Sequence, residues 1–91
     1  MKTQKVPGKD AGAIMLYALS TCVWCNKTKA LLNELGVAYD YVEVDLLKKS
    51  ERKDTLDIVK GYNPSCSFPT MVINDTCIVG FKEAEIREAL K

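Results

Sequence analysis

Residues 13–25 decide the fold, and they read AIMLYALSTCVWC. The run 13–19 is apolar and does not alternate with polar residues, which is typical of a central strand covered on both faces. After a Ser-Thr pair, a helix is expected to run from Val23 to Leu35, because apolar side chains recur at helical spacing. Gly36 follows at the position where helices commonly end in a left-handed residue. The stretch therefore predicts a buried strand that leads directly into a helix.

The segments that follow extend this unit. Residues 37–45 are rich in β-branched and aromatic residues, so they predict a second strand. A strand–helix–strand connection of this length favours parallel strands and a right-handed crossover. A charged stretch then enters a second helix, whose buried side carries Leu56 and Val59 and which is expected to end at Gly61.

The remaining part of the chain predicts a hairpin and a last helix. Residues 70–73 and 76–79 are short apolar runs separated by Asn74-Asp75, a good signal for a two-residue turn. Residues 83–90 then show helical spacing of apolar side chains. The expected order is β-α-β-α-β-β-α, an α/β fold with a four-stranded mixed sheet flanked by three helices.

Length and composition narrow the functional classes. The 91 residues allow one domain, predicted over 13–91, behind a flexible N-terminal lead-in over 1–12 that is rich in glycine and lysine. The net charge of +1 indicates no excess of positive charge of the kind that binds nucleic acid or an anionic membrane. Histidine is absent, which excludes histidine acid–base chemistry and histidine metal sites. No apolar run is long enough for a secretory signal or a membrane span, so a cytoplasmic location is expected.

The chemistry is expected at Cys22 and Cys25, which lie where the predicted strand meets the first helix. A helix N-terminus presents unpaired backbone N–H groups and the positive end of the helix dipole, and both stabilise an anion. Since the thiolate is the nucleophilic form of cysteine, Cys22 is expected to be reactive. Two intervening residues on a helical turn bring Cys25 close enough for internal attack or a disulfide. A Cys-x-x-Cys motif in this context indicates redox work.

Pro69 is the second candidate feature, because it introduces the first hairpin strand, where proline removes one ladder donor. A cis bond between Phe68 and Pro69 is predicted. It would make a tight entry turn and leave the backbone of Phe68 free to pair with an extended peptide or thiol ligand.

These features together resemble the glutaredoxin branch of the thioredoxin superfamily, over about residues 14–90. The resemblance implies a thioredoxin-like fold in which Cys22 is the nucleophile, Cys25 resolves the mixed disulfide, and Pro69 is cis beside them. It further implies a monomeric thiol–disulfide oxidoreductase that acts on disulfide-containing client proteins and requires no metal or organic cofactor. The matching residues are Tyr17, Ser20, Thr21, Cys22, Val23, Trp24, Cys25, Leu35, Gly36, Val44, Asp45, Phe68, Pro69, Thr70 and Gly80.

The expected substrate-binding residues surround the two cysteines and the proline. Trp24 is interpreted either as a core residue or as an exposed aromatic surface for a partner, and Phe81 either as a core residue or as a wall of the thiol groove. The full predicted set is Thr21, Val23, Trp24, Phe68, Pro69, Gly80 and Phe81.

Three departures from the family pattern concern the electron donor. Val23-Trp24 stands in place of the usual Pro-Tyr pair, and Leu19 stands where many glutaredoxins have a lysine that meets a glutathione carboxylate. Gly80-Phe81-Lys82 replaces a paired glycine followed by two aspartates. The expected donor is therefore a low-molecular-weight thiol or a thioredoxin-reductase-type flavoprotein, with glutathione recognised poorly.

Alternatives stay open for the cysteines. Four thiolates could hold zinc or an iron–sulfur cluster, although Cys66 and Cys77 are eleven residues apart and do not form a second close pair. A dimer bridged by an iron–sulfur cluster, which stores or delivers the cluster, is the competing function. Cys77 is interpreted as a small buried hydrophobic residue, and Cys66 either as a spectator or as a regulatory thiol near the active site.

Overall fold

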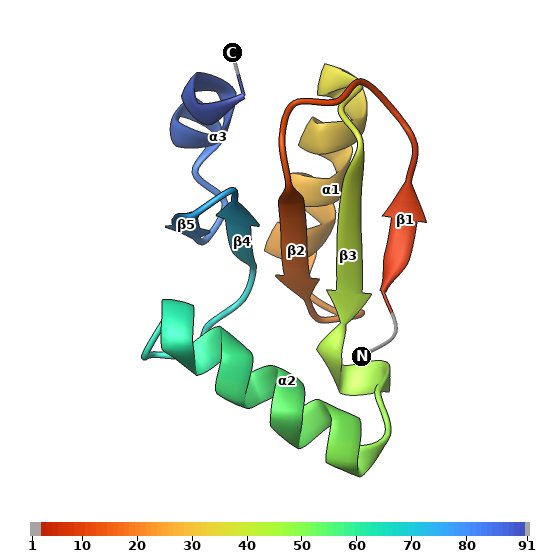
Figure 1. The fold of residues 1–91 in the computed structure, drawn as a ribbon, viewed down its shortest axis with the longest axis vertical. Helices are drawn as coiled ribbons and strands as arrows, with labels where there is room; N and C mark the ends of the chain where they lie inside the picture. Colours follow the sequence, from red (N-terminus) through yellow and green to blue (C-terminus); the bar gives the residue numbers. More distant parts are fainter. Residues whose placement is uncertain (1–2, 91) are drawn as a thin grey trace.

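The computed structural model describes residues 3–90, whose strands form one mixed five-stranded sheet (Figure 1). The order across the sheet is β1-β3-β2-β4-β5. The central strand β2 is parallel to β3 and antiparallel to β4, while the two outer pairs are antiparallel. The strands are β1 (Gln4–Val6), β2 (Ile14–Ala18), β3 (Tyr39–Glu43), β4 (Thr70–Ile73) and β5 (Thr76–Val79).

Three α-helices cover the two faces of this sheet (Figure 1). Helices α1 (Val23–Leu35) and α3 (Glu83–Ala89) pack on one face, and α2 (Lys49–Tyr62) packs on the other. A short 3-10 helix, η1 (Val44–Leu46), connects β3 to α2. From β2 onwards the elements follow the predicted β-α-β-α-β-β-α order, which confirms the predicted α/β architecture.

The predicted number of four strands was wrong, because β1 adds a fifth strand inside the segment predicted as a flexible lead-in. β1 pairs antiparallel with β3, with Gln4 opposite Tyr41 and Val6 opposite Tyr39. Its side chains are exposed or half-buried, and Lys5 pairs with Asp40 at 3.4 Å. An exposed edge strand of three residues carries no buried alternating pattern, so the sequence offered no local signal for it.

The chain after β1 is also held against the body of the protein. The Lys9 N–H donates to the Gly36 carbonyl at 2.8 Å, and the Ala38 N–H donates to the Lys9 carbonyl at 2.8 Å. Gly8 passes so close that a Cβ atom there would lie 2.7 Å from the Gly36 carbonyl oxygen. This approach requires glycine and ties the N-terminal segment to the connection between α1 and β3.

Burial on both faces explains why β2 is apolar throughout. Leu16 and Ala18 point into the cluster under α1 and α3, and Tyr17 points into the cluster under α2. The cluster under α1 and α3 also contains Cys25, Leu31, Leu32, Met71 and Ile86, and the cluster under α2 contains Val42, Val44, Val59 and Val72. The core therefore has two layers separated by the sheet.

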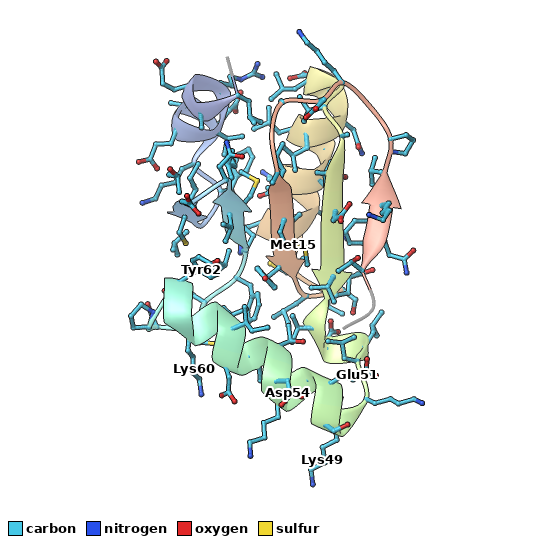
Figure 2. The ribbon with its side chains drawn as sticks, viewed as in Figure 1. Met15, Lys49, Glu51, Asp54, Lys60 and Tyr62 are labelled. Carbon is cyan, nitrogen blue, oxygen red and sulfur yellow. The ribbon has the colours of Figure 1, made fainter. Side chains whose placement is uncertain are left out.

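The charged stretch of α2 forms the outer side of that helix. Lys49, Asp54 and Lys60 point away from the sheet (Figure 2), while Thr55 and Val59 are buried beneath it. The helix continues one residue beyond the predicted stop at Gly61. Within residues 3–90 no helix combines the length and apolar character that crossing a membrane requires.

Candidate active site

The two cysteines of the motif lie at the start of α1, where the sequence placed them. Cys22 is the N-cap residue, with an extended backbone, and the Cys25 backbone N–H donates to its Sγ atom at 3.2 Å. This hydrogen bond and the helix dipole both stabilise negative charge on sulfur. Cys22 is half-buried, so this residue remains partly exposed while it is held at the helix terminus.

Cys25 has a contrasting environment, because its side chain is fully buried in the cluster under α1 and α3. Burial and, next, the hydrogen bond to Cys22 raise the pKa of the Cys25 thiol to about 12. Both thiols are free. The arrangement thus pairs a half-buried cysteine at a helix N-terminus with a buried cysteine whose thiol keeps its proton.

The loop before Cys22 is held by a carboxylate 25 residues away in the sequence. Asp45, in η1, accepts hydrogen bonds from the Ser20 backbone N–H at 2.8 Å and from the Ser20 hydroxyl at 2.5 Å. These hydrogen bonds lower the pKa of Asp45. Arg52 in turn donates to the Leu47 carbonyl at 3.0 Å and so holds the end of η1 to α2. We call the Ser20–Asp45 interaction the loop clamp.

Asp45 was not among the predicted site residues, and it was named only among the residues that match the glutaredoxin pattern. The available signal was its position: β2 and β3 are parallel, so polar residues just after their carboxyl ends lie at the same edge of the sheet. Ser20 follows β2 by two residues and Asp45 follows β3 by two residues. Such a pair is expected to meet.

Pro69 lies in the loop that enters β4, and the Phe68–Pro69 peptide bond is cis, as predicted. The Pro69 carbonyl accepts a hydrogen bond from the Gly80 N–H at 2.8 Å. The buried Asn63 side chain holds the other end of this loop, since it donates to the Ser67 carbonyl at 3.2 Å and to the Thr70 hydroxyl at 3.1 Å. The proline loop is therefore fixed from both sides.

Five of the predicted substrate-binding residues meet in one small pocket. Its volume is about 240 Å³, and it is lined by Trp24, Phe68, Pro69, Gly80 and Phe81. The Trp24 and Phe81 rings stack with centroids 6.1 Å apart and an interplanar angle of 24°. Trp24 is 55% exposed, so it belongs to the surface and not to the core. Thr21 and Val23 are exposed beside the cysteines but do not line this pocket.

The other two cysteines lie apart from this arrangement. Cys77 in β5 is opposite Val72, the predicted register, and burial raises the pKa of its thiol. It is half-buried, so it is less enclosed than predicted. Cys66 is half-buried, has a positive φ of 51°, and packs against the cluster under α2. Within residues 3–90 the structure brings together no group of three or more side chains of the kinds that hold metal ions.

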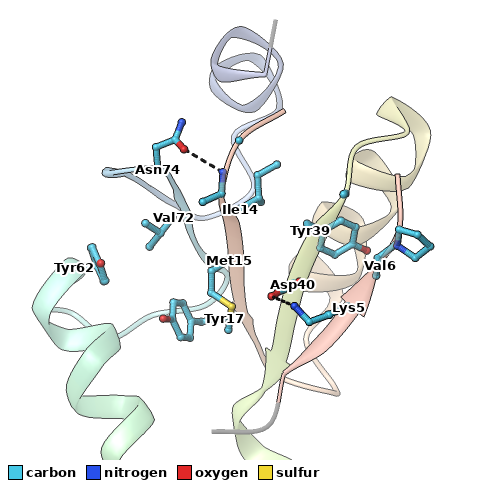
Figure 3. A pocket seen from close by; sticks show the side chains of 14 residues that line it. Lys5, Val6, Ile14, Met15, Tyr17, Tyr39, Asp40, Tyr62, Val72 and Asn74 are labelled. Atoms are coloured by element: carbon cyan, nitrogen blue, oxygen red, sulfur yellow. Dashed lines mark hydrogen bonds and ion pairs between the residues drawn. The ribbon is translucent and has the colours of Figure 1, made fainter. Parts of the chain in front are cut away.

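A larger cavity of about 690 Å³ lies on the sheet face that α2 covers only in part (Figure 3). Met15, Tyr17, Tyr62 and Val72 gather around it, and the Lys5–Asp40 ion pair lies at its other side (Figure 3). None of the four cysteines lines it. The smaller pocket, in contrast, is lined by Trp24, which lies in the chain between Cys22 and Cys25.

A mixed sheet with this helix arrangement, a dithiol at a helix start and a cis-proline loop defines a thioredoxin-fold protein with a dithiol redox site. The glutaredoxin family model matches residues 14–78, and the chain belongs to the glutaredoxin family. A crystal structure of Methanosarcina acetivorans methanoredoxin is 57% identical over 91% of this chain and 88% of that chain, with a TM-score of 0.88.

Two further relatives support this assignment. The crystal structure of the glutaredoxin from Methanosarcina mazei Go1 is 54% identical over 99% of this chain and 88% of that chain, with a TM-score of 0.90. An uncharacterized glutaredoxin-like 8.6 kDa protein in the rubredoxin operon of Clostridium pasteurianum is 28% identical over 86% of this chain and 97% of that protein.

Proposed function

We propose that the chain is a thiol–disulfide oxidoreductase that reduces protein disulfides and mixed disulfides through Cys22 and Cys25. The observation that carries this proposal is the contrast between the two thiols: Cys22 accepts a backbone hydrogen bond at the helix start, whereas Cys25 is fully buried with a pKa raised to about 12. Only one of the two sulfurs is then prepared to attack, which gives the pair a defined order of action.

In the first step the Cys22 thiolate attacks one sulfur of the client disulfide. A new S–S bond forms between Cys22 and the client, the client disulfide breaks, and the second client sulfur leaves as a thiolate that takes a proton from water. The Cys25 N–H and the positive end of the helix dipole lie at the sulfur that attacks in this step.

In the second step Cys25 loses its proton and attacks the Cys22 sulfur, so that a Cys22–Cys25 disulfide forms and the remaining client thiol leaves. Two electrons have then passed from the dithiol to the client. Burial is the largest cause of the raised pKa of Cys25, but the charge and the hydrogen bond of Cys22 add to it. In the mixed disulfide Cys22 no longer carries a charge, so this contribution to the raised pKa of Cys25 is lost, whereas the contribution of burial remains.

The test compares two variants on two substrates. Cys22→Ser is expected to abolish reduction of both an insulin disulfide and a low-molecular-weight mixed disulfide, because the nucleophile is gone. Cys25→Ser is expected to abolish insulin reduction and to retain part of the mixed-disulfide activity, because a second thiol from solution can take over the resolving step. Activity in Cys22→Ser with complete loss in Cys25→Ser would reverse the roles.

A dimer that carries an iron–sulfur cluster is the outcome that would overturn the proposal. Protein purified without oxygen is expected to be colourless and active in insulin reduction. Visible charge-transfer absorption, together with a dimeric mass and no disulfide reduction, would instead support cluster storage or delivery.

We propose further that the electron donor is a low-molecular-weight thiol smaller than glutathione or a flavoprotein reductase. Leu19 packs against the cluster under α2 and offers no charge to a ligand carboxylate, and Lys82 is exposed and lies 4.0 Å from Glu85. Each missing charge-assisted contact to glutathione should forfeit on the order of 1.5–3 kcal/mol. Loss of two such contacts weakens recognition by roughly a hundredfold or more.

A further inference from the structure

Two bulky apolar side chains next to the nucleophile are left uncovered. Val23 is 63% exposed and Trp24 is 55% exposed, and both lie between the two cysteines. Only three other large hydrophobic residues are comparably exposed in residues 3–90, and all three are more than twenty residues from Cys22 and Cys25 in the sequence. Adjacent exposed apolar groups at a reactive sulfur mark a surface that another molecule covers.

The stacked rings of Trp24 and Phe81, which we call the aromatic shelf, form one wall of the pocket beside the proline loop. Every residue that lines this pocket is apolar or glycine. Its volume of about 240 Å³ is below the range of roughly 300–1,000 Å³ typical of sites for whole drug-sized ligands. The pocket therefore fits one apolar side chain of a longer molecule.

A positive charge lies directly beside the shelf. The Lys27 Nζ atom is 4.7 Å from the centroid of the Trp24 ring. None of the ion pairs within residues 3–90 involves Lys27, so its ammonium group is available to a carboxylate of a partner.

Beyond Lys27 the surface carries charges of both signs that are paired with one another. A second hollow of about 360 Å³ continues from Phe81, and Lys27, Glu34, Glu83 and Arg87 are among its lining residues. Arg87 pairs there with Glu34 at 2.7 Å and with Glu83 at 2.9 Å, so two carboxylates surround one guanidinium. Because the guanidinium already has these two partners, the favourable position for a negative charge of a client is close to Lys27.

We propose that the aromatic shelf and Lys27 select client segments in which a bulky apolar side chain lies next to the reactive cysteine and one carboxylate follows within about two residues. Successive residues of an extended chain are about 3.3 Å apart, so two residues span a distance comparable with the 4.7 Å between Lys27 Nζ and the Trp24 ring that forms a wall of the pocket. The inference rests on the proposed function, since the client must first present its disulfide to Cys22.

The experiment measures reduction of symmetrical peptide disulfides by stoichiometric reduced protein, with no other reductant present. Each event consumes one peptide disulfide, oxidises the Cys22–Cys25 pair and releases two peptide thiols, which are counted by chromatography after acid quenching. Four capped peptides are compared. The first has glycine on both sides of cysteine, and the second has phenylalanine next to cysteine. The third and fourth also have phenylalanine next to cysteine, with either glutamate or lysine two residues from the phenylalanine.

The phenylalanine peptide is expected to react about tenfold faster than the glycine peptide, because its apolar side chain moves from water into the apolar pocket. Trp24→Ala and Phe81→Ala should each bring the ratio of these two rates close to one, and Trp24→Phe should restore most of it. The ratio within one variant is the readout, so a general loss of activity does not affect the conclusion.

The charge preference is tested separately. The peptide with glutamate should react several times faster than the peptide with lysine at low salt, and Lys27→Gln should remove this preference, as should high salt. Lys49→Gln, on the outer side of α2, is the matched control and should retain it. Equal rates for all peptides would overturn the inference and leave the proposed function intact. Failure of every peptide to oxidise the protein would overturn both.

Discussion

Replacement of Asp45 by asparagine is expected to weaken the loop clamp that holds the segment before Cys22. Asparagine has the same shape and can still hydrogen-bond to Ser20, but the charge that strengthens both hydrogen bonds is lost. A hydrogen bond to a charged group contributes about 1.5–3 kcal/mol, against about 0.5–1.5 kcal/mol for a neutral one. Each bond thus loses about 1 kcal/mol, and because Asp45 is partly exposed, solvent screening reduces the sum to about 1 kcal/mol. For a domain of this size this lowers Tm by roughly 4–8 °C.

The pH dependence identifies the carboxylate as the cause. Hydrogen bonds from Ser20 lower the pKa of Asp45 in the folded protein. The stabilisation is therefore fully present above the ordinary value of 3.8 and is lost as the pH falls through the lowered folded-state pKa. In urea denaturation, the free energy of unfolding of Asp45→Asn should lie below that of the unaltered protein at pH 7, and the difference should shrink as the pH falls below 3.8 and through the lowered folded-state pKa.

The control is Asp57→Asn, which removes a carboxylate from an exposed position of α2. It should leave the free energy of unfolding within about 0.5 kcal/mol of the starting value. Loosening of the loop should also slow alkylation of Cys22 by iodoacetamide in Asp45→Asn but not in Asp57→Asn. A loss of stability at pH 7 that does not shrink as the pH falls below 3.8, or no loss at all, would refute the loop clamp as a source of stability.

Three further outcomes are expected. Gly8→Ala should destabilise the fold by about 1–3 kcal/mol in urea denaturation, because the added Cβ would meet backbone atoms at 2.7 Å. Gly61→Ala, where an added Cβ would meet no other segment within 4 Å, should stabilise the fold by about 0.5–1 kcal/mol. Equal effects of the two substitutions would contradict the close approach at Gly8. Mass spectrometry after iodoacetamide treatment of the native protein between pH 6 and 9 should find Cys22 modified and Cys25 unmodified, since burial raises the pKa of Cys25 to about 12, and equal labelling would argue against the proposed order of action. In steady-state kinetics, glutathione-dependent turnover should not saturate at millimolar concentrations, and saturation comparable with that of a smaller thiol would show that the missing contacts are replaced elsewhere.

The elements that could be predicted from the sequence are those whose signal is local. The run that forms β2 is apolar because both faces of the sheet are covered. The end of α1 was predictable from Gly36, which adopts φ 69°. The turn between β4 and β5 was predictable from the Asn74-Asp75 pair, and Asn74 adopts a positive φ of 55°. Each of these residues fulfils a requirement of its own backbone or of the nearest turn.

The parts that escaped prediction depend on partners distant in sequence. β1 forms because its backbone pairs with residues 39–41 at the edge of the sheet, and the sequence of Gln4–Val6 alone does not indicate this pairing. The site shows the same division. The Cys-x-x-Cys motif and Pro69 are recognisable from the chain alone. The contact between Ser20 and Asp45 and the stack of Trp24 on Phe81 appear only when segments 25 and 57 residues apart are brought together.

The position of the only tryptophan gives the molecule a built-in optical reporter. Trp24 lies between the two cysteines, stacks on Phe81 and has an ammonium group over its ring. Indole emission responds to a neighbouring disulfide, to a charge near the ring and to removal of water from its surface. All tryptophan emission of this chain therefore comes from the site itself, free of background from the rest of the fold. Formation of the mixed disulfide, closure of the Cys22–Cys25 bond and arrival of a client can thus be followed in real time without a dye.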